Sequence, residues 1–408
     1  MASKNSTATQ GLAGWLHLMG PGLITAALVF GPSKMTITSK LGALYSTDLL
    51  WIVLVATLFM IVFTSMAARI GLASSHTFLQ LLAMKWGRWA AVLVGAGVFL
   101  VCSSFQAGNA VGVGIAMGEL FGTSPTPWIL GFTALSIALL FFKSFYKVLE
   151  QLMILLILLM LASFVMTLLW TPPSLQLIAQ GFQFKLPPGS QGLVIAFIAS
   201  SFSLVGALYQ AYLVQERRRV RPETAGQTNG TVAGIILLGL MSSITLLAAA
   251  NILYPRQINP QSASDMGKAL EPLFGAKASA IFLVGLFGAG FSSLVGNASV
   301  GGSLLSDGLG WGGQFKDIQT RWLIAAIMLI GATVAVLFGK LPLQLIIFAQ
   351  SITIFIVPLI GIALFLIAND PFIMGDAKNK GWQNMLGIVG LLLIVTLAAL
   401  NFNDWFLN

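Results

Sequence analysis

The stretch Gly31-Pro32-Ser33-Lys34 interrupts an otherwise apolar run that covers residues 20–45. Gly and Pro break helices, and a lysine inside a long apolar run is expensive to keep away from water. Lys34 lies fourteen residues after Gly20, a helical rise of ~21 Å that reaches deep into a hydrocarbon core of ~30 Å. We therefore predict that Lys34 marks a substrate or ion site inside a membrane.

The composition around this stretch is that of a polytopic membrane protein. Of 408 residues, 57% are hydrophobic and only 8% are charged. Soluble domains do not have this composition. Because a membrane span needs ~20 apolar residues, the sequence predicts eleven spans within one transmembrane domain (20–408), after a short cytoplasmic segment (1–19). The predicted spans cover residues 20–45, 49–70, 89–118, 127–146, 150–171, 192–216, 229–254, 278–305, 321–339, 343–368 and 383–402.

The distribution of Lys and Arg in the loops predicts the orientation. With a cytoplasmic N-terminus, fourteen of these residues fall on the inner side and five on the outer side, as the positive-inside rule requires. The odd number of spans then places the C-terminus outside, and we expect the protein in a prokaryotic inner membrane. The net charge of +9 follows from this bias; without a basic face carrying interleaved aromatic residues, it does not predict binding to nucleic acid.

A second span is interrupted in the same way as the first. The sixth span contains the polar and flexible stretch Ser200-Ser201-Phe202-Ser203-Leu204-Val205-Gly206. The two interruptions are five spans apart, so the two halves of the chain have inverted orientations. Paired broken helices at corresponding positions of two halves indicate a transporter with its site near the membrane midplane.

In these segments the chain resembles the NRAMP family of divalent-metal transporters. The resemblance implies an all-α, leucine-transporter-like fold, with two inverted five-helix repeats, an eleventh helix, and broken helices 1 and 6. The stretches that carry it are Gly20-Pro21-Gly22, Gly31-Pro32-Ser33-Lys34, Ala67-Ala68-Arg69-Ile70-Gly71, Ser144-Phe145-Tyr146-Lys147-Val148-Leu149-Glu150, Leu213-Val214-Gln215 and Gly288-Ala289-Gly290-Phe291-Ser292-Ser293, with Gln350 and Pro358 in the tenth span.

The chain departs from this family at the positions that bind the metal. The family carries Asp-Pro-Gly-Asn in the first break, where Gly31 replaces the Asp and Lys34 replaces the Asn. In the sixth span, Ser200 and Ser203 stand where the family has Ala and a ligating Met. A dehydrated divalent cation needs oxygen, nitrogen or sulfur ligands with compensating negative charge, so we expect no metal site, no cofactor and no transport of transition metals.

Three interpretations of Lys34 stay open. Its stem can carry the ammonium to the membrane interface, the ammonium can replace a structural cation, or it can contact an anionic substrate. We favour the third, because the helix after the break begins near Ser33 and its free N–H groups attract negative charge. The predicted substrate is a small inorganic anion, with bicarbonate as the first choice over nitrate or a small carboxylate. The predicted substrate-binding residues are Gly31, Pro32, Ser33, Lys34, Ser200, Ser201, Ser203 and Gln350.

Import of an anion against the membrane potential requires a coupled cation, either Na⁺ or H⁺. We expect a sodium site between backbone carbonyls of the first break and Ser292, Ser293 and Asn297 of the eighth span, although such small polar residues also serve helix packing. Lys34 could instead carry the coupled proton. The acidic proton-path positions of the family fall on the neutral amides Gln106 and Asn109, which we expect to line the pathway without titrating.

Other functions remain as alternatives. The chain could carry hydrated Mg²⁺ or Mn²⁺ at an altered site, or a small organic solute such as an amino acid, or it could be a membrane sensor that no longer transports. No catalytic motif or nucleotide-binding loop predicts an enzyme. We expect a monomer whose only partners are the small solute, the coupling ion and the lipid bilayer.

Overall fold

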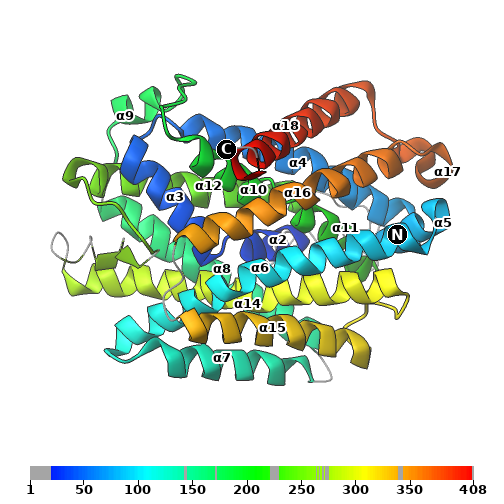
Figure 1. The fold of residues 1–408 in the computed structure, drawn as a ribbon, viewed down its shortest axis with the longest axis horizontal. Helices are drawn as coiled ribbons and strands as arrows, with labels where there is room; N and C mark the ends of the chain where they lie inside the picture. Colours follow the sequence, from blue (N-terminus) through cyan, green and yellow to red (C-terminus); the bar gives the residue numbers. More distant parts are fainter. Residues whose placement is uncertain are drawn as a thin grey trace, which may run out of the picture.

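The protein is described here by a computed structural model that covers residues 20–141, 145–170, 172–220, 229–262, 264–265, 267–268, 271, 275–338 and 343–406. These residues form helices and loops, with no strand among them (Figure 1). The helices are α2 (Gly20–Val29), α3 (Pro32–Tyr45), α4 (Leu50–Ala73), α5 (Phe78–Trp86), α6 (Arg88–Phe121), α7 (Pro125–Leu140), α8 (Phe145–Trp170), α9 (Leu175–Gln180), α10 (Gln191–Ser201), α11 (Leu204–Val220), α12 (Asn229–Ile252), α14 (Ala276–Leu309), α15 (Ile318–Phe338), α16 (Leu343–Ala368), α17 (Pro371–Met374) and α18 (Gly381–Phe406), with 3₁₀ turns η2 (Tyr254–Arg256) and η3 (Gly375–Ala377).

Each of the eleven predicted spans coincides with one helix or with a broken pair of helices. The first span is the pair α2 and α3, and the sixth is the pair α10 and α11. Within the described part of the chain, seven helical segments are long and apolar enough to cross a membrane, counting the pair α10 and α11 (Gln191–Arg219) as one. The number is eight if Ile352–Ala368 and its bent continuation Pro371–Ala377 form one span. The 10-residue α2 and the 14-residue α3 are too short to do so separately.

One predicted boundary is wrong. The fourth predicted span ran to residue 146 and the fifth began at residue 150, whereas α7 ends at Leu140 and α8 already begins at Phe145. Lys143 and Ser144 interrupt the apolar run here, but the aromatic residues Phe145 and Tyr146 follow at once, so hydropathy alone does not fix the boundary to within a few residues.

Local sequence explains both helix breaks. At the first, Gly31 has an extended backbone (φ −97°, ψ 175°) and Pro32 opens α3 at its first turn, where the absent N–H costs nothing. At the second, the Phe202 N–H closes the end of α10 by donating to the Ile198 carbonyl (2.7 Å). Ser203 then caps the start of α11, because its Oγ accepts from the Gly206 N–H (3.1 Å). The break is therefore shorter than the seven-residue stretch that the sequence predicted.

The broken helices lie inside the bundle and pack against full-length helices. α2 and α3 both lie along α12, and α6 runs beside α14 over much of its length (Figure 1). Glycines bring α2 close to α12: a Cβ on Gly234 would lie 2.1 Å from the carbonyl carbon of Gly22. No larger residue fits at that crossing, which fixes α2 against α12 in this conformation.

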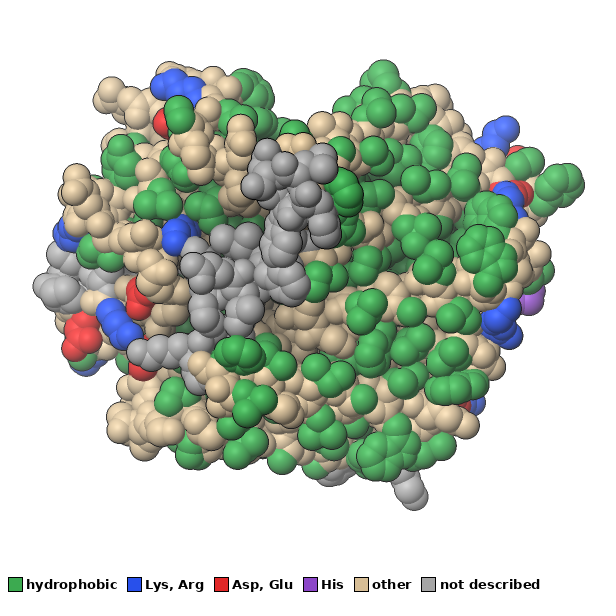
Figure 2. All heavy atoms as spheres, in the orientation of Figure 1, with side chains coloured by type: hydrophobic (Ala, Val, Ile, Leu, Met, Phe, Trp, Pro, Cys, Tyr) green, Lys and Arg blue, Asp and Glu red, His purple; other side chains and the backbone are tan. Residues whose placement is uncertain are grey.

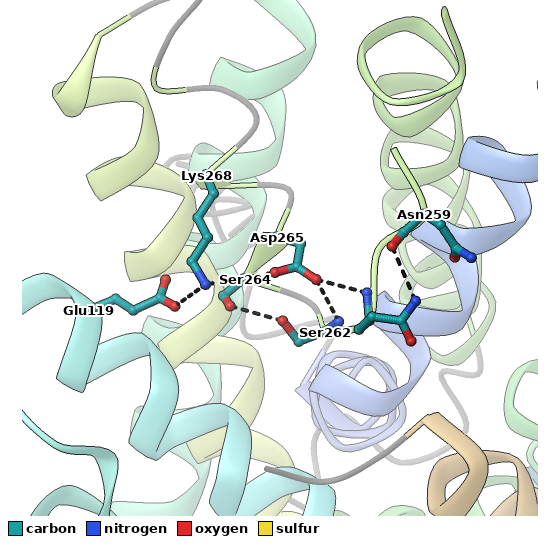
Figure 3. A network of polar contacts seen from close by, with 7 residues as sticks. Glu119, Asn259, Ser262, Ser264, Asp265 and Lys268 are labelled. Atoms are coloured by element: carbon teal, nitrogen blue, oxygen red, sulfur yellow. Dashed lines mark hydrogen bonds and ion pairs between the residues drawn. The ribbon is translucent and has the colours of Figure 1, made fainter. Parts of the chain in front are cut away.

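The surface agrees with a protein embedded in a bilayer. Apolar side chains cover the middle of the face drawn in Figure 2, and Lys, Arg, Asp and Glu gather at its two ends. At one of these ends a polar network joins α6 to the connection between η2 and α14 (Figure 3). There the Lys268 ammonium lies 2.8 Å from Glu119 and 3.7 Å from Asp265, and Asp265 accepts from two backbone N–H groups of that connection.

Candidate substrate site

A cavity lies where the two broken helices meet. It is lined by residues of α2 and α3, of α10 and α11, and of α6, α14 and α16. About 40 Å³ of it is open to the centres of water molecules, several times the ~10–15 Å³ that a single water needs. The cavity therefore has room for a small ion or a few waters. The described residues that line it include Gly31, Ser33, Lys34, Asn109, Ser200, Ser203, Asn297 and Thr353, and none of these described lining residues is Asp, Glu, His, Cys or Met.

Lys34 connects the two broken helices across this cavity. Its side chain is only 3% exposed, and its Nζ donates to the Ser201 Oγ at 2.8 Å. The same Nζ lies 5.4 Å from the centroid of the Phe197 ring, over its face. The ammonium thus stays within the protein and does not reach for the membrane interface, which removes the first of the three interpretations of this residue.

Of the three serines predicted in the sixth span, two line the cavity and one does not. Ser200 and Ser203 line the cavity, whereas Ser201 is the partner of Lys34 and is not among the lining residues. The Ser200 Oγ donates to the Phe197 carbonyl (2.9 Å) and the Ser203 Oγ caps α11. Each hydroxyl is held by its own helix end.

Some of the other residues predicted to bind substrate also line the cavity, and others do not. Gly31 and Ser33 line the cavity. Pro32 instead packs on α6, where a Cβ added to Gly112 would lie 2.2 Å from the Pro32 ring. The side chain of Gln350 lies outside the described residues. The first break therefore contributes three of its four predicted residues to the cavity wall, Gly31, Ser33 and Lys34.

A side chain at Gly31 would require neighbouring side chains to move. A Cβ at this position would lie 2.8 Å from the Asn109 Oδ1 and 2.9 Å from the Ser293 Oγ. These are shorter than real Cβ contacts, so a larger residue would displace α6 or α14 side chains. The space in which the resemblance would place a ligating carboxylate is occupied by a neutral amide and a hydroxyl.

The two amides predicted to lie along the pathway are neighbours in α6. The Gln106 Nε2 donates to the Leu294 carbonyl of α14 (2.7 Å), and the Asn109 Nδ2 lies 3.5 Å from the Gln106 Oε1. Asn109 lines the cavity, whereas Gln106 is fully buried behind it against Gly331 of α15.

The residues predicted to bind the coupling ion meet the end of α2. The Ser293 Oγ donates to the carbonyls of Ala27 (3.2 Å) and Leu28 (3.1 Å), and the Ser292 Oγ donates to the Ala27 carbonyl (2.9 Å). The Asn297 Nδ2 donates to the Leu28 carbonyl (3.1 Å). These contacts bring together the predicted oxygen groups, and they also pack α14 on α2, so both interpretations of this cluster persist.

Asp307 is a buried acid that the sequence pattern did not single out, since it follows the last predicted residue of the eighth span. It is 1% exposed at the end of α14. Its Oδ2 accepts from the Thr77 Oγ1 (2.5 Å) and the Tyr212 Oη (2.6 Å), while its Oδ1 is buried without a hydrogen-bond partner. It ties α14 to α11 and to the residue that precedes α5. Lys40 of α3 is also buried at 8% exposure, but it does not line the cavity.

Two broken helices that meet at a cavity with polar groups in its wall, within a bundle of membrane-length helices, define a secondary transporter of the leucine-transporter-like class. The chain belongs to the Nramp family: residues 22–403 match the family described as natural resistance-associated macrophage protein-like. The fold and the family implied by the resemblance are thereby confirmed.

Similar proteins cover nearly the whole chain. A divalent metal cation transporter MntH of Pectobacterium carotovorum is 24% identical over 94% of this chain and 93% of its own, and one of Deinococcus radiodurans is 25% identical over 98% and 91%. The structure of a manganese transporter of Eremococcus coleocola superposes with a TM-score of 0.79 at 16% identity, covering 99% of this chain and 90% of its own. MhsT in complex with L-phenylalanine gives a TM-score of 0.61 at 15% identity, over 97% and 100%.

Proposed function

We propose that this Nramp-family transporter carries a small monovalent anion through the cavity between its broken helices, with bicarbonate as the cargo. The observation that carries the proposal is the buried Lys34 amine at a cavity whose described lining residues include no carboxylate. A buried ammonium without a carboxylate partner is costly, and a bound anion would compensate its charge. The size of the cavity suits a cargo of a few heavy atoms.

The helix end beside Lys34 adds to the attraction. α3 begins at Pro32 with no side-chain cap, so the N–H groups of its first turn have no partner within the helix. Partial positive charge at such a helix end favours anions. Ser33 and Lys34 belong to this first turn and line the cavity, which supports a site where the helix end and the ammonium act on the same anion.

The same groups work against a divalent cation. A like charge at ~4–6 Å and an effective dielectric constant of ~20 costs roughly 3–4 kcal/mol per unit charge, and twice that for a dication. At about 1.4 kcal/mol per tenfold change, this removes several decades of affinity. Gly31 supplies no carboxylate to offset that cost, and the side chains of Asn109 and Ser293 already approach the position where one would begin.

A second candidate is transport of a divalent metal cation. The similar proteins favour it and give no support to an anion, because the relatives from Pectobacterium carotovorum and Deinococcus radiodurans carry the name divalent metal cation transporter. The amide and hydroxyl oxygens of Asn109, Asn297 and Ser203 line the cavity and could receive a hydrated cation. This function would require Lys34 to lose its proton or to turn away from the cavity.

Coupling to a cation completes the proposal. Each imported negative charge works against ~2.3 kcal/mol per 100 mV of inside-negative potential. A sodium ion among the Ala27 and Leu28 carbonyls and the hydroxyls of Ser292 and Ser293 would meet the oxygen ligands that it prefers. For this to happen, the hydroxyls that now donate to these carbonyls would rotate away from them.

The test is uptake into proteoliposomes that contain the purified protein. Labelled bicarbonate, nitrate, Mn²⁺ and an amino acid are supplied separately, with a sodium gradient, a pH gradient or neither, and protein-free liposomes correct for diffusion of CO₂. We expect saturable bicarbonate uptake driven by one of the gradients, and no saturable Mn²⁺ uptake. Saturable Mn²⁺ uptake without any anion uptake would establish the second candidate and remove the first.

A further inference from the structure

The hydrogen bonds behind the cavity orient its amide groups. The Leu294 carbonyl can only accept, so the Gln106 amide turns its NH₂ group toward it (2.7 Å) and its Oε1 toward Asn109. Because Oε1 can also only accept, Asn109 offers its NH₂ group to Gln106 (3.5 Å). The Asn109 Oδ1 is left facing Gly31, at the wall of the cavity.

Asn297 of α14 also directs its NH₂ group toward a carbonyl oxygen of the protein. Its Nδ2 donates to the Leu28 carbonyl (3.1 Å), and the residue lines the cavity. The NH₂ groups of both amides are thus drawn toward carbonyl oxygens of the protein. The cavity has hydrogen-bond donors at Lys34 and the first turn of α3, and the Asn109 Oδ1 is a hydrogen-bond acceptor at its wall.

We infer that Asn109 selects a monovalent oxyanion that carries a hydroxyl hydrogen of its own, an inference that rests on the proposed anion transport. Bicarbonate fits this arrangement, because its negative oxygens can accept from Lys34 while its O–H donates to the Asn109 Oδ1. Nitrate, formate and chloride have the charge but no hydrogen to donate. They would leave a buried acceptor unpaired and bring an anionic atom toward its lone pairs.

A site built to hydrogen-bond a substrate hydroxyl discriminates strongly against an analogue that lacks it, because the polar group of the site is left without a partner. In the wild-type protein we therefore expect the inhibition constant of nitrate to exceed the KM for bicarbonate by roughly 10-fold or more. Gln106 acts as a positioning residue: it does not line the cavity, and it determines which end of the Asn109 amide faces it.

The experiment measures uptake of labelled bicarbonate into proteoliposomes with nitrate as competitor, at a mildly alkaline pH. Asn109→Leu has a similar shape and cannot accept a hydrogen bond, so the KM for bicarbonate rises while inhibition by nitrate does not weaken, and selectivity falls to near unity. Gln106→Met frees the Asn109 amide to turn and relaxes selectivity without changing the cavity lining. It also tests the inference if Asn109→Leu does not yield a monodisperse protein.

Thr353→Val is the matched control, since Thr353 lines the same cavity but its Oγ1 donates to the Ala349 carbonyl of its own helix (3.1 Å). This variant should keep wild-type selectivity. Unchanged discrimination against nitrate in both α6 variants, with bicarbonate uptake intact, would overturn the role of Asn109 and leave the proposed function standing. Absence of anion uptake by the wild-type protein would instead remove the proposed function, and the inference with it.

Discussion

Replacement of Lys34 by Gln tests the central feature of the site. Gln has a similar length and keeps N–H donors, but it removes the positive charge from a side chain that is 3% exposed. Loss of a desolvated, charge-assisted contact is worth ~2–5 kcal/mol. At ~1.4 kcal/mol per tenfold change, uptake at subsaturating bicarbonate should fall at least ~30-fold.

Stability separates a substrate contact from a structural cation. The Ser201 Oγ loses a charged donor at 2.8 Å, but Gln can supply a neutral one, and removal of a buried charge relieves its desolvation cost. We therefore expect the melting temperature of the purified Lys34→Gln protein to stay close to that of the wild type. If Lys34 instead serves as a structural cation, the Lys34→Gln substitution should lower the melting temperature and the uptake rate together.

Two further variants control for charge and for geometry. Lys40→Gln removes another buried charge from the same helix, at a residue that does not line the cavity, and should leave the KM unchanged. Ser201→Ala keeps the Lys34 charge but removes its hydrogen-bond partner, and should reduce uptake less than Lys34→Gln does. A Lys34→Gln protein with wild-type melting and wild-type uptake would refute the anion site.

Three other changes have defined outcomes. Gly31→Asp should lower the melting temperature and should not create a Mn²⁺ site detectable by calorimetry, because its Cβ would lie 2.8 Å from the Asn109 Oδ1; a one-to-one Mn²⁺ isotherm would contradict this. Asp307→Ala should cost ~1–3 kcal/mol in denaturant unfolding by leaving buried hydroxyl donors without their acceptor, and Asp307→Asn, which keeps an oxygen, should cost less; equal losses would show that the hydrogen bonds are not responsible. The hydrogen bond to Glu119 raises the pKa of Lys268 above its usual range, so the stability that this contact adds is complete below the ordinary lysine pKa of ~10.4 and is lost as pH rises through the raised value. The difference in melting temperature between wild type and Lys268→Gln should therefore be small at neutral pH and vanish at strongly alkaline pH, and a difference that grows with pH would exclude this origin.

Local sequence predicted the broken helices and the depth of Lys34 for a physical reason. Partition into a bilayer depends on the summed hydropathy of ~20 consecutive residues, and helix interruption depends on Gly, Pro and Ser at the break itself. Both are properties of short stretches of chain. The spacing of the two breaks by five spans predicted that the two halves are inverted, and the family resemblance then supplied the fold that brings the first broken span beside the sixth.

Packing between distant segments decided how the site is arranged. Lys34 and Ser201 are 167 residues apart, and Gln106 and Leu294 are 188 apart, so no local pattern could tell whether the lysine points to the membrane surface or across the cavity. The same holds for Gly31, whose missing side chain looked like the loss of a ligand. Only the tertiary structure shows Asn109 and Ser293 in that space. Composition and periodicity decide which segments are buried, but the direction of a side chain and the orientation of an amide depend on the groups that packing brings next to them.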